Sequence, residues 1–135
     1  MTTELTWLML TAILASSLWI PYVVGVNIST YEGQKTSFER PPDQSQMPAW
    51  VHRSYRAHLN LLEQFLPFAV IVLIGYQLKV STPITQGCVI LFFWLRLAHA
   101  IGMISGMARM PVRPIIFTTG WIITLVMAWQ VWAKA

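Results

Sequence analysis

Four long apolar stretches, almost free of charged residues, constrain the fold of this chain more than any other feature. They cover residues 5–26, 56–79, 84–107 and 114–133. An α-helix of about 20 apolar residues crosses the roughly 30 Å hydrocarbon core of a bilayer. The sequence therefore predicts an all-α integral membrane protein, a four-helix bundle that forms one domain over residues 1–135. Pro21 should kink the first helix near its end.

Composition points to the lipid bilayer as the surroundings of this protein. Apolar residues make up 56% of the chain and charged residues only 10%, whereas soluble domains have about 45–50% and about 25%. The seven Trp, six Phe and four Tyr exclude intrinsic disorder. The single cysteine, Cys88, excludes a disulfide scaffold. The net charge of +4 comes from few, scattered basic residues, so we expect no nucleic-acid partner.

The basic residues predict how the chain is oriented in the membrane. With four spans, the first and third connections lie on one side of the bilayer. That side holds Lys35, Arg40, Arg53, Arg56, Arg109 and Arg113, and the other side holds Lys79 and Lys134. The positive-inside rule then places the loop 27–55 in the cytoplasm and both termini outside. The compact loops and the lack of retention or lipidation signals suit a bacterial inner membrane.

Three polar or charged side chains, Glu63, Arg96 and His99, interrupt the apolar stretches. A charge near the bilayer centre costs about 2.5–3.5 kcal/mol, so such residues should face the bundle interior and find partners. Arg56, Asn60 and Glu63 share one helical face at positions i, i+4 and i+7, and Arg96 shares a face with His99. If the two faces meet, Glu63 pairs with Arg96. This pair could be a buried salt bridge that only registers the bundle, or part of a binding site.

The number of arginines favours a binding site. Four arginines could converge near the cytoplasmic ends of the second, third and fourth helices, against one nearby acid, Glu63. They are Arg56, Arg96, Arg109 and Arg113. A pocket with surplus positive charge suits an anion, and arginine binds carboxylates through two parallel hydrogen bonds. No set of His, Cys, Asp and Glu has metal-ligand spacing, so we predict no metal site.

Three segments resemble those of one known family. Residues 56–68 read RAHLNLLEQFLPF and resemble the second-helix motif of the MAPEG family, the membrane-associated proteins in eicosanoid and glutathione metabolism. Residues 96–99 read RLAH and resemble its third-helix motif. Residues 109–113 read RMPVR and resemble the basic turn before the fourth helix in its prostaglandin-synthase members. The resemblance covers nearly the whole chain.

This resemblance implies a homotrimer of four-helix protomers that binds glutathione between neighbouring protomers, near the cytoplasmic face. Arg56, Asn60 and Glu63 match second-helix positions that shape or contact the glutathione pocket. Arg96 and His99 belong to the third-helix motif, in which the histidine position lines the same pocket. Glutathione is therefore the expected cosubstrate.

Arg113 matches the arginine that, in the catalytic members of the family, lies close to the glutathione thiol. An arginine near a thiol favours the thiolate, which is the nucleophile. The membrane would supply an apolar electrophile or a lipid hydroperoxide by partition. The resemblance thus implies a glutathione transferase with peroxidase activity, in which Arg113 is catalytic.

Four positions depart from the family pattern and keep a second hypothesis open. Leu59, Met103, Pro114 and Phe117 stand where glutathione-binding members have an arginine, two tyrosines and a serine. Each of those groups would donate a hydrogen bond to an anionic ligand. The alternative is a non-catalytic subunit of a larger membrane complex. A small transporter or channel is a weaker hypothesis, because one polar cluster on one side of the bilayer does not make a path across it.

Overall fold

The computed structural model describes residues 1–29, 43–108 and 110–135, and within them every regular element is a helix. The elements are α1 (Thr3–Ser17), α2 (Ile20–Ile28), the short 3-10 helix η2 (Gln44–Gln46), α3 (Ala49–Gln77), α4 (Pro83–Ser105) and α5 (Val112–Lys134). Four spans are long and apolar enough to cross a membrane: Thr3–Ile28, which combines α1 and α2, and the helices α3, α4 and α5. The predicted all-α fold with four spans is confirmed.

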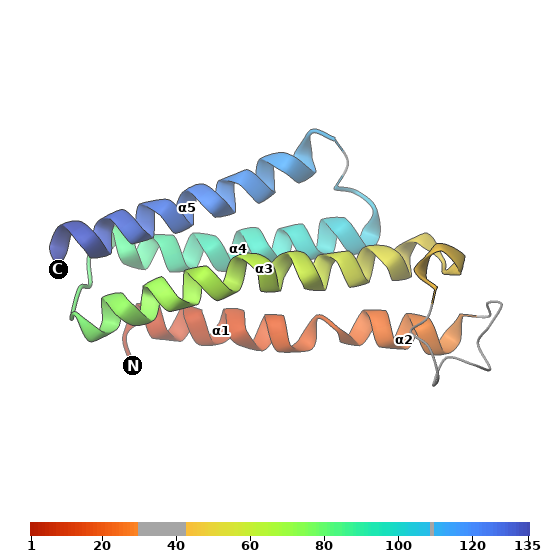
Figure 1. The fold of residues 1–135 in the computed structure, drawn as a ribbon, viewed down its shortest axis with the longest axis horizontal. Helices are drawn as coiled ribbons and strands as arrows, with labels where there is room; N and C mark the ends of the chain where they lie inside the picture. Colours follow the sequence, from red (N-terminus) through yellow and green to blue (C-terminus); the bar gives the residue numbers. More distant parts are fainter. Residues whose placement is uncertain (30–42, 109) are drawn as a thin grey trace.

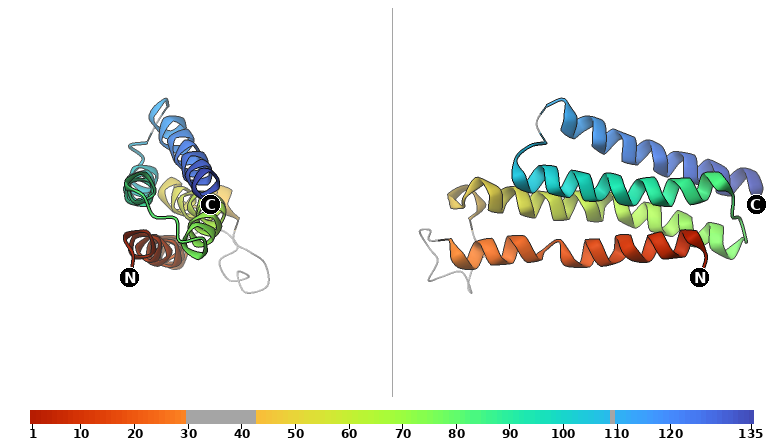
Figure 2. Two further views of the ribbon diagram at one scale, coloured as in Figure 1. Left: turned by 90° about the vertical axis from the view of Figure 1, so that its left-hand side faces the viewer. Right: turned by 180° about the vertical axis from the view of Figure 1, so that it is seen from behind.

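The helices form an elongated bundle with α3 and α4 at its centre. Each of these two helices packs against the other and against both α1 and α5, as the end-on view in Figure 2 shows. Both termini lie at one end of the bundle, and the end of α2, the start of α3 and the start of α5 lie at the other end (Figure 1). The helix ends that flank the first and third connections therefore lie at one end of the bundle, as the four-span prediction requires. Lys35, Arg40 and Arg109 lie outside the described residues.

The first span consists of two helices with a break between them. Helix α1 ends at Ser17 and α2 begins at Ile20, directly before Pro21. Proline has no N–H to donate to the carbonyl four residues earlier, and its ring crowds that carbonyl. The expected kink near the end of this helix is therefore present, and its cause is the proline.

The α3 helix begins at Ala49, not at residue 56 as predicted, so the connection before it is shorter than 27–55. The extra helical turns are tied to α4 through Arg53. Its Nε donates to the carbonyl of Met103 at 2.9 Å, and its Nη2 donates to the carbonyl of Ile104 at 3.2 Å. Both carbonyls belong to the last turn of α4, where the helix itself provides few N–H donors. Hydropathy gives no information about such long-range bonds. The prediction therefore placed this polar segment in the loop.

The interior of the bundle contains two apolar clusters. The cluster nearer the chain termini consists of Leu8, Phe68, Val72, Cys88, Val89, Phe92, Ile123, Met127 and Val131. The other consists of Ala15, Leu18, Ala57, Leu61, Ala100 and Met103. Between them along α3 and α4 lie Gln64, Arg96 and His99, all buried, which we call the polar layer.

The outer surface of the bundle is also apolar. Large exposed hydrophobic side chains occur on every span, among them Ile13, Leu66, Leu73, Leu91, Trp94, Ile101, Ile122 and Trp129. A soluble monomer rarely exposes contiguous apolar surface on this scale, whereas helices in a bilayer place such side chains against lipid. The surface therefore agrees with four membrane spans.

Candidate functional site

Arg96 is the centre of the polar layer and lies near the middle of α4. Only 1% of its surface is exposed. Its Nη2 donates to the carbonyl of Ile116 on α5 at 2.9 Å, and its guanidinium carbon lies 5.6 Å from the centre of the Phe92 ring. Its Nε and Nη1 are buried without a hydrogen-bond partner. The charge is thus held by one carbonyl and one aromatic face, an arrangement that leaves two nitrogen atoms without a partner.

The predicted ion pair between Glu63 and Arg96 is wrong. Glu63 is exposed, and no ion pair of these two residues occurs in the described protomer. The buried face of α3 passes through Ala57, Leu61 and Gln64. Because successive residues of an α-helix are turned by about 100°, Glu63 lies on the exposed side of α3 while Gln64 points into the bundle, toward α5.

Gln64 is the polar side chain that α3 buries in this layer, and Gly120 on α5 leaves room for it. The Gln64 Nε2 donates to the carbonyl of Phe117 at 3.1 Å, and its Oε1 is buried without a partner. A Cβ at position 120 would lie 2.6 Å from this Oε1 and would also collide with the Nη2 of Arg96. Sequence reasoning missed both residues. Spacing with Leu61 and Phe68 on the buried face could have identified Gln64.

His99 completes the polar layer. It is 2% exposed, and its Nε2 is buried without a hydrogen-bond partner. Arg96 and His99, predicted to share one face of the helix, are thus both buried in this layer.

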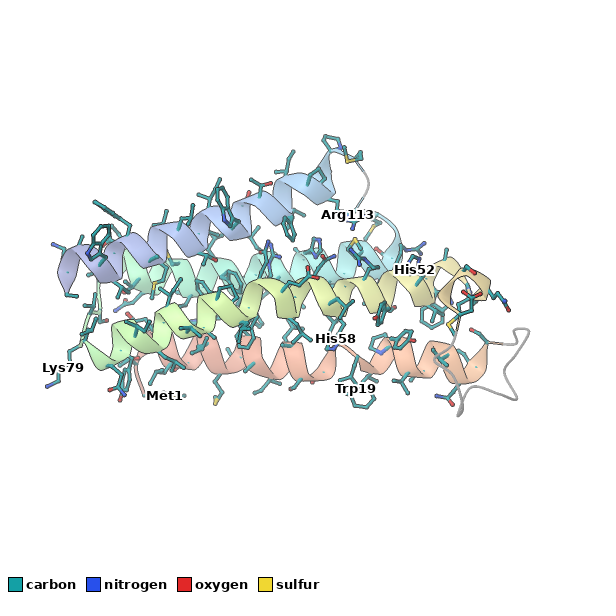
Figure 3. The ribbon with its side chains drawn as sticks, in the orientation of Figure 1. Met1, Trp19, His52, His58, Lys79 and Arg113 are labelled. Carbon is teal, nitrogen blue, oxygen red and sulfur yellow. The ribbon has the colours of Figure 1, made fainter. Side chains whose placement is uncertain are left out.

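A cavity of about 340 Å³ lies where α5 begins. Its wall includes Asn60 from α3 and Arg113 from α5, together with Met110, Pro114, Phe117 and Thr118. The start of α5 diverges from α4 in this region (Figure 1), and Figure 3 shows Arg113 on the first turn of α5. The structure thus brings together Asn60 and Arg113, which are far apart in sequence. Within the described residues, no group of three His, Cys, Asp or Glu side chains could hold a metal ion.

The remaining second-helix residues of the predicted site lie outside this cavity. Asn60 is buried, but Arg56 and Glu63 on the same side of α3 are exposed. Their side chains are therefore free to contact a ligand or a second protein surface, and the single protomer does not enclose them.

The sequence also matches a known protein family. The sequence model of the MAPEG family matches residues 5–133, nearly the whole chain. The chain belongs to the MAPEG family. No curated protein matches it in a sequence search. Family membership and the four apolar spans make it an integral, multi-pass membrane protein.

In this MAPEG protein, the four departures from the family pattern fall in different places. Pro114 and Phe117 line the cavity beside Arg113. Met103 is buried in the apolar cluster with Ala100, so its side chain belongs to the core. Leu59 is half-buried and does not line the cavity. Two of the four substitutions therefore make the cavity wall more apolar.

The lone guanidinium of the polar layer leads to a stability prediction. Arg96→Met should leave the free energy of unfolding unchanged or raise it by about 1 kcal/mol, because no acid loses its partner and the apolar chain length is kept. Arg96→Ala should lower it by about 2 kcal/mol or more, because a cavity opens. Denaturant unfolding in detergent micelles measures both. A strong loss of stability in the methionine variant would contradict the unpaired state of Arg96.

Proposed function

We propose that this MAPEG protein is a glutathione-dependent membrane transferase that conjugates or reduces apolar electrophiles. The observation that carries the proposal is the cavity that joins Asn60 and Arg113 at the start of α5. It combines an amide and a free guanidinium with the apolar side chains of Met110, Pro114 and Phe117. Such a wall suits a polar, anionic peptide and an apolar second substrate in one place.

The tripeptide would be held by the groups of the site that lack partners. Asn60 supplies an amide that both donates and accepts hydrogen bonds. The polar layer would add the guanidinium nitrogens of Arg96 and the ring nitrogen of His99, which are buried without a hydrogen-bond partner. The exposed Arg56 and Glu63 would complete the pocket from the outside, where a neighbouring protomer of a homotrimer covers them. Glu63 is then positioned to hold an amino group and Arg56 a carboxylate.

Arg113 would be the catalytic residue. Its guanidinium beside the glutathione sulfur stabilises the thiolate, which is the reactive form. In conjugation, this sulfur adds to an electrophilic double bond: it forms a bond to one carbon, the π bond breaks, and the neighbouring atom takes up the proton released by the thiol. In reduction of a lipid hydroperoxide, two glutathione molecules give a disulfide, an alcohol and one water.

The membrane supports the proposal by concentrating the second substrate. Pro114 and Phe117 replace hydrogen-bond donors of the family pattern and present apolar surface to the cavity. An electrophile that partitions into lipid would meet this surface in the cavity at the start of α5. We further propose that this end of the bundle faces the cytoplasm of a bacterium, where the basic residues Arg53, Arg56 and Arg113 would lie.

Glutathione binding to the purified protein tests this function. Calorimetry measures binding, and the ultraviolet absorbance of the thiolate measures ionisation of the sulfur in the same sample. We expect binding with thiolate formation at neutral pH. Absence of binding at millimolar glutathione would overturn the proposal. If other subunits then co-purify in fixed ratio from mild detergent, the chain is an accessory subunit of a larger complex.

A further inference from the structure

A second cavity lies at the opposite end of the bundle from the site described above. It has a volume of about 210 Å³ and is bordered by Glu4, Val72, Tyr76, Lys79, Ser81 and Met127, among others. This volume is well above the roughly 10–15 Å³ that one water needs. The start of α1, the turn between α3 and α4, and the end of α5 all lie at this end (Figure 1). The membrane spans end here, so the cavity lies where lipid headgroups meet the protein.

The carboxylate of Glu4 gives this cavity an incomplete polar site. Glu4 is 5% exposed. Its Oε1 accepts hydrogen bonds from the Ser81 hydroxyl at 2.7 Å and from the Thr85 hydroxyl at 2.8 Å. Its Oε2 is buried and has no hydrogen-bond partner. A buried carboxylate oxygen without a donor is costly, so this atom calls for a donor from outside the chain.

No cation of the described residues satisfies this oxygen. Neither Lys79 nor the amino group of Met1 forms an ion pair with Glu4. Lys79 is exposed at the border of the cavity, and Figure 3 shows it at the end of the bundle. Its position is set by the backbone, because the Lys79 N–H donates to the carbonyl of Tyr76 and the Val80 N–H to that of Gly75. This is the Schellman motif that ends α3, with Lys79 at φ 57°.

The cavity therefore has three chemical parts. An oxygen of the Glu4 carboxylate lacks a donor, and the ammonium group of Lys79 at the border lacks an anion. The wall also includes the buried side chains of Val72 and Met127. Opposite charges on one opening select a zwitterion, and the apolar wall selects a hydrocarbon chain.

We propose that this cavity binds a zwitterionic phospholipid with a primary ammonium headgroup. The Glu4 carboxylate turns toward the cavity and accepts a hydrogen bond from the ammonium, the phosphate pairs with Lys79, and an acyl chain lies along the apolar part of the wall. A trimethylated headgroup has no N–H to donate and is bulkier, so it fits less well. An anionic headgroup meets the negative charge of Glu4. This inference is independent of glutathione binding.

Native mass spectrometry of the detergent-purified protein tests the lipid site. The protein is incubated with phosphatidylethanolamine, phosphatidylcholine or phosphatidylglycerol of identical acyl chains. We expect the ethanolamine lipid to bind at least about tenfold more tightly than the other two, because only it forms the charge-assisted hydrogen bond. Equal retention of the three lipids would overturn the proposal.

Matched variants separate this site from general lipid adsorption. Glu4→Gln keeps an oxygen for the two hydroxyls but removes the charge, so the preference for ethanolamine should fall about tenfold. Asparagine tolerates the left-handed backbone at position 79. Lys79→Asn removes the group that pairs with the phosphate, so it should also weaken binding of the ethanolamine lipid. Asp43→Asn removes one negative charge near the opposite end of the bundle and should change nothing.

Two outcomes would contradict the proposal even if Glu4→Gln folds poorly. Undiminished ethanolamine-lipid binding by the Lys79→Asn variant would show that the phosphate is bound elsewhere. Complete displacement of the lipid by water-soluble phosphoethanolamine would show that the acyl chain contributes nothing, and that the ligand is a soluble amine.

Discussion

Arg113→Ala is expected to abolish formation of the glutathione thiolate on this protein. Removing a group that stabilises the reacting charge lowers turnover by about 10²–10³-fold. The pH at which the bound thiol ionises should rise to that of a free thiol, about 8.5. The thiolate absorbance as a function of pH and the rate of conjugation measure the two effects.

Stability should not change in this variant, which separates catalysis from folding. Arg113 is exposed and makes no hydrogen bond or ion pair within the described residues, so its truncation should alter the free energy of unfolding by no more than about 0.5 kcal/mol. Lys134→Ala removes the same charge from the far end of α5 and should leave thiolate formation intact. Unchanged turnover in Arg113→Ala would refute the catalytic role.

Gly120→Ala should destabilise the bundle by about 3 kcal/mol, the upper part of the range for overpacked cores. The added methyl group would collide with the Arg96 Nη2 and lie 2.6 Å from the Gln64 Oε1. Both side chains are buried and bonded to the preceding turn of α5. If they move aside, they lose these bonds, and if they stay, α5 must move away from α3 and α4.

Gly87→Ala is the matched control for this prediction. Gly87 lies inside α4 on the outer surface, and a Cβ there meets nothing within 4 Å. Alanine is the better helix former by about 0.5–1 kcal/mol, so this variant should be slightly more stable. Unfolding of both variants by denaturant in detergent gives the comparison. Equal stability of the two would contradict the close approach of α5 to the polar layer.

The four spans could be predicted because lipid imposes a simple requirement on each segment separately. Every span needs enough consecutive apolar residues to cross the bilayer, and that property is local in sequence. The break before Pro21 was predictable for the same reason, since a proline acts on its own helix. The start of α3 was not predictable, because the bonds of Arg53 to the end of α4 join segments about 50 residues apart.

In the candidate site, too, some features were predictable from local sequence and others depended on distant contacts. Motif and charge identified Asn60, Arg96, His99 and Arg113, and the structure places these residues in or beside one layer and one cavity. The predicted partner of Arg96 was mistaken, because Glu63 has the complementary charge but is exposed, and the Arg96 guanidinium bonds to a carbonyl of α5 instead. Charge can be read from one residue, whereas direction depends on which face of α3 packs against α4.

Sequence alone therefore establishes the membrane spans, the family and the residues capable of chemistry, since each depends on local composition or on a short motif. Tertiary packing decides which of those residues meet. It turns Gln64 inward and Glu63 outward, and it lets α5 approach at Gly120. It also leaves one carboxylate oxygen of Glu4 unpaired beside a cavity that no motif indicates. Such contacts depend on the rotation and spacing of whole helices, which many distant side chains determine together.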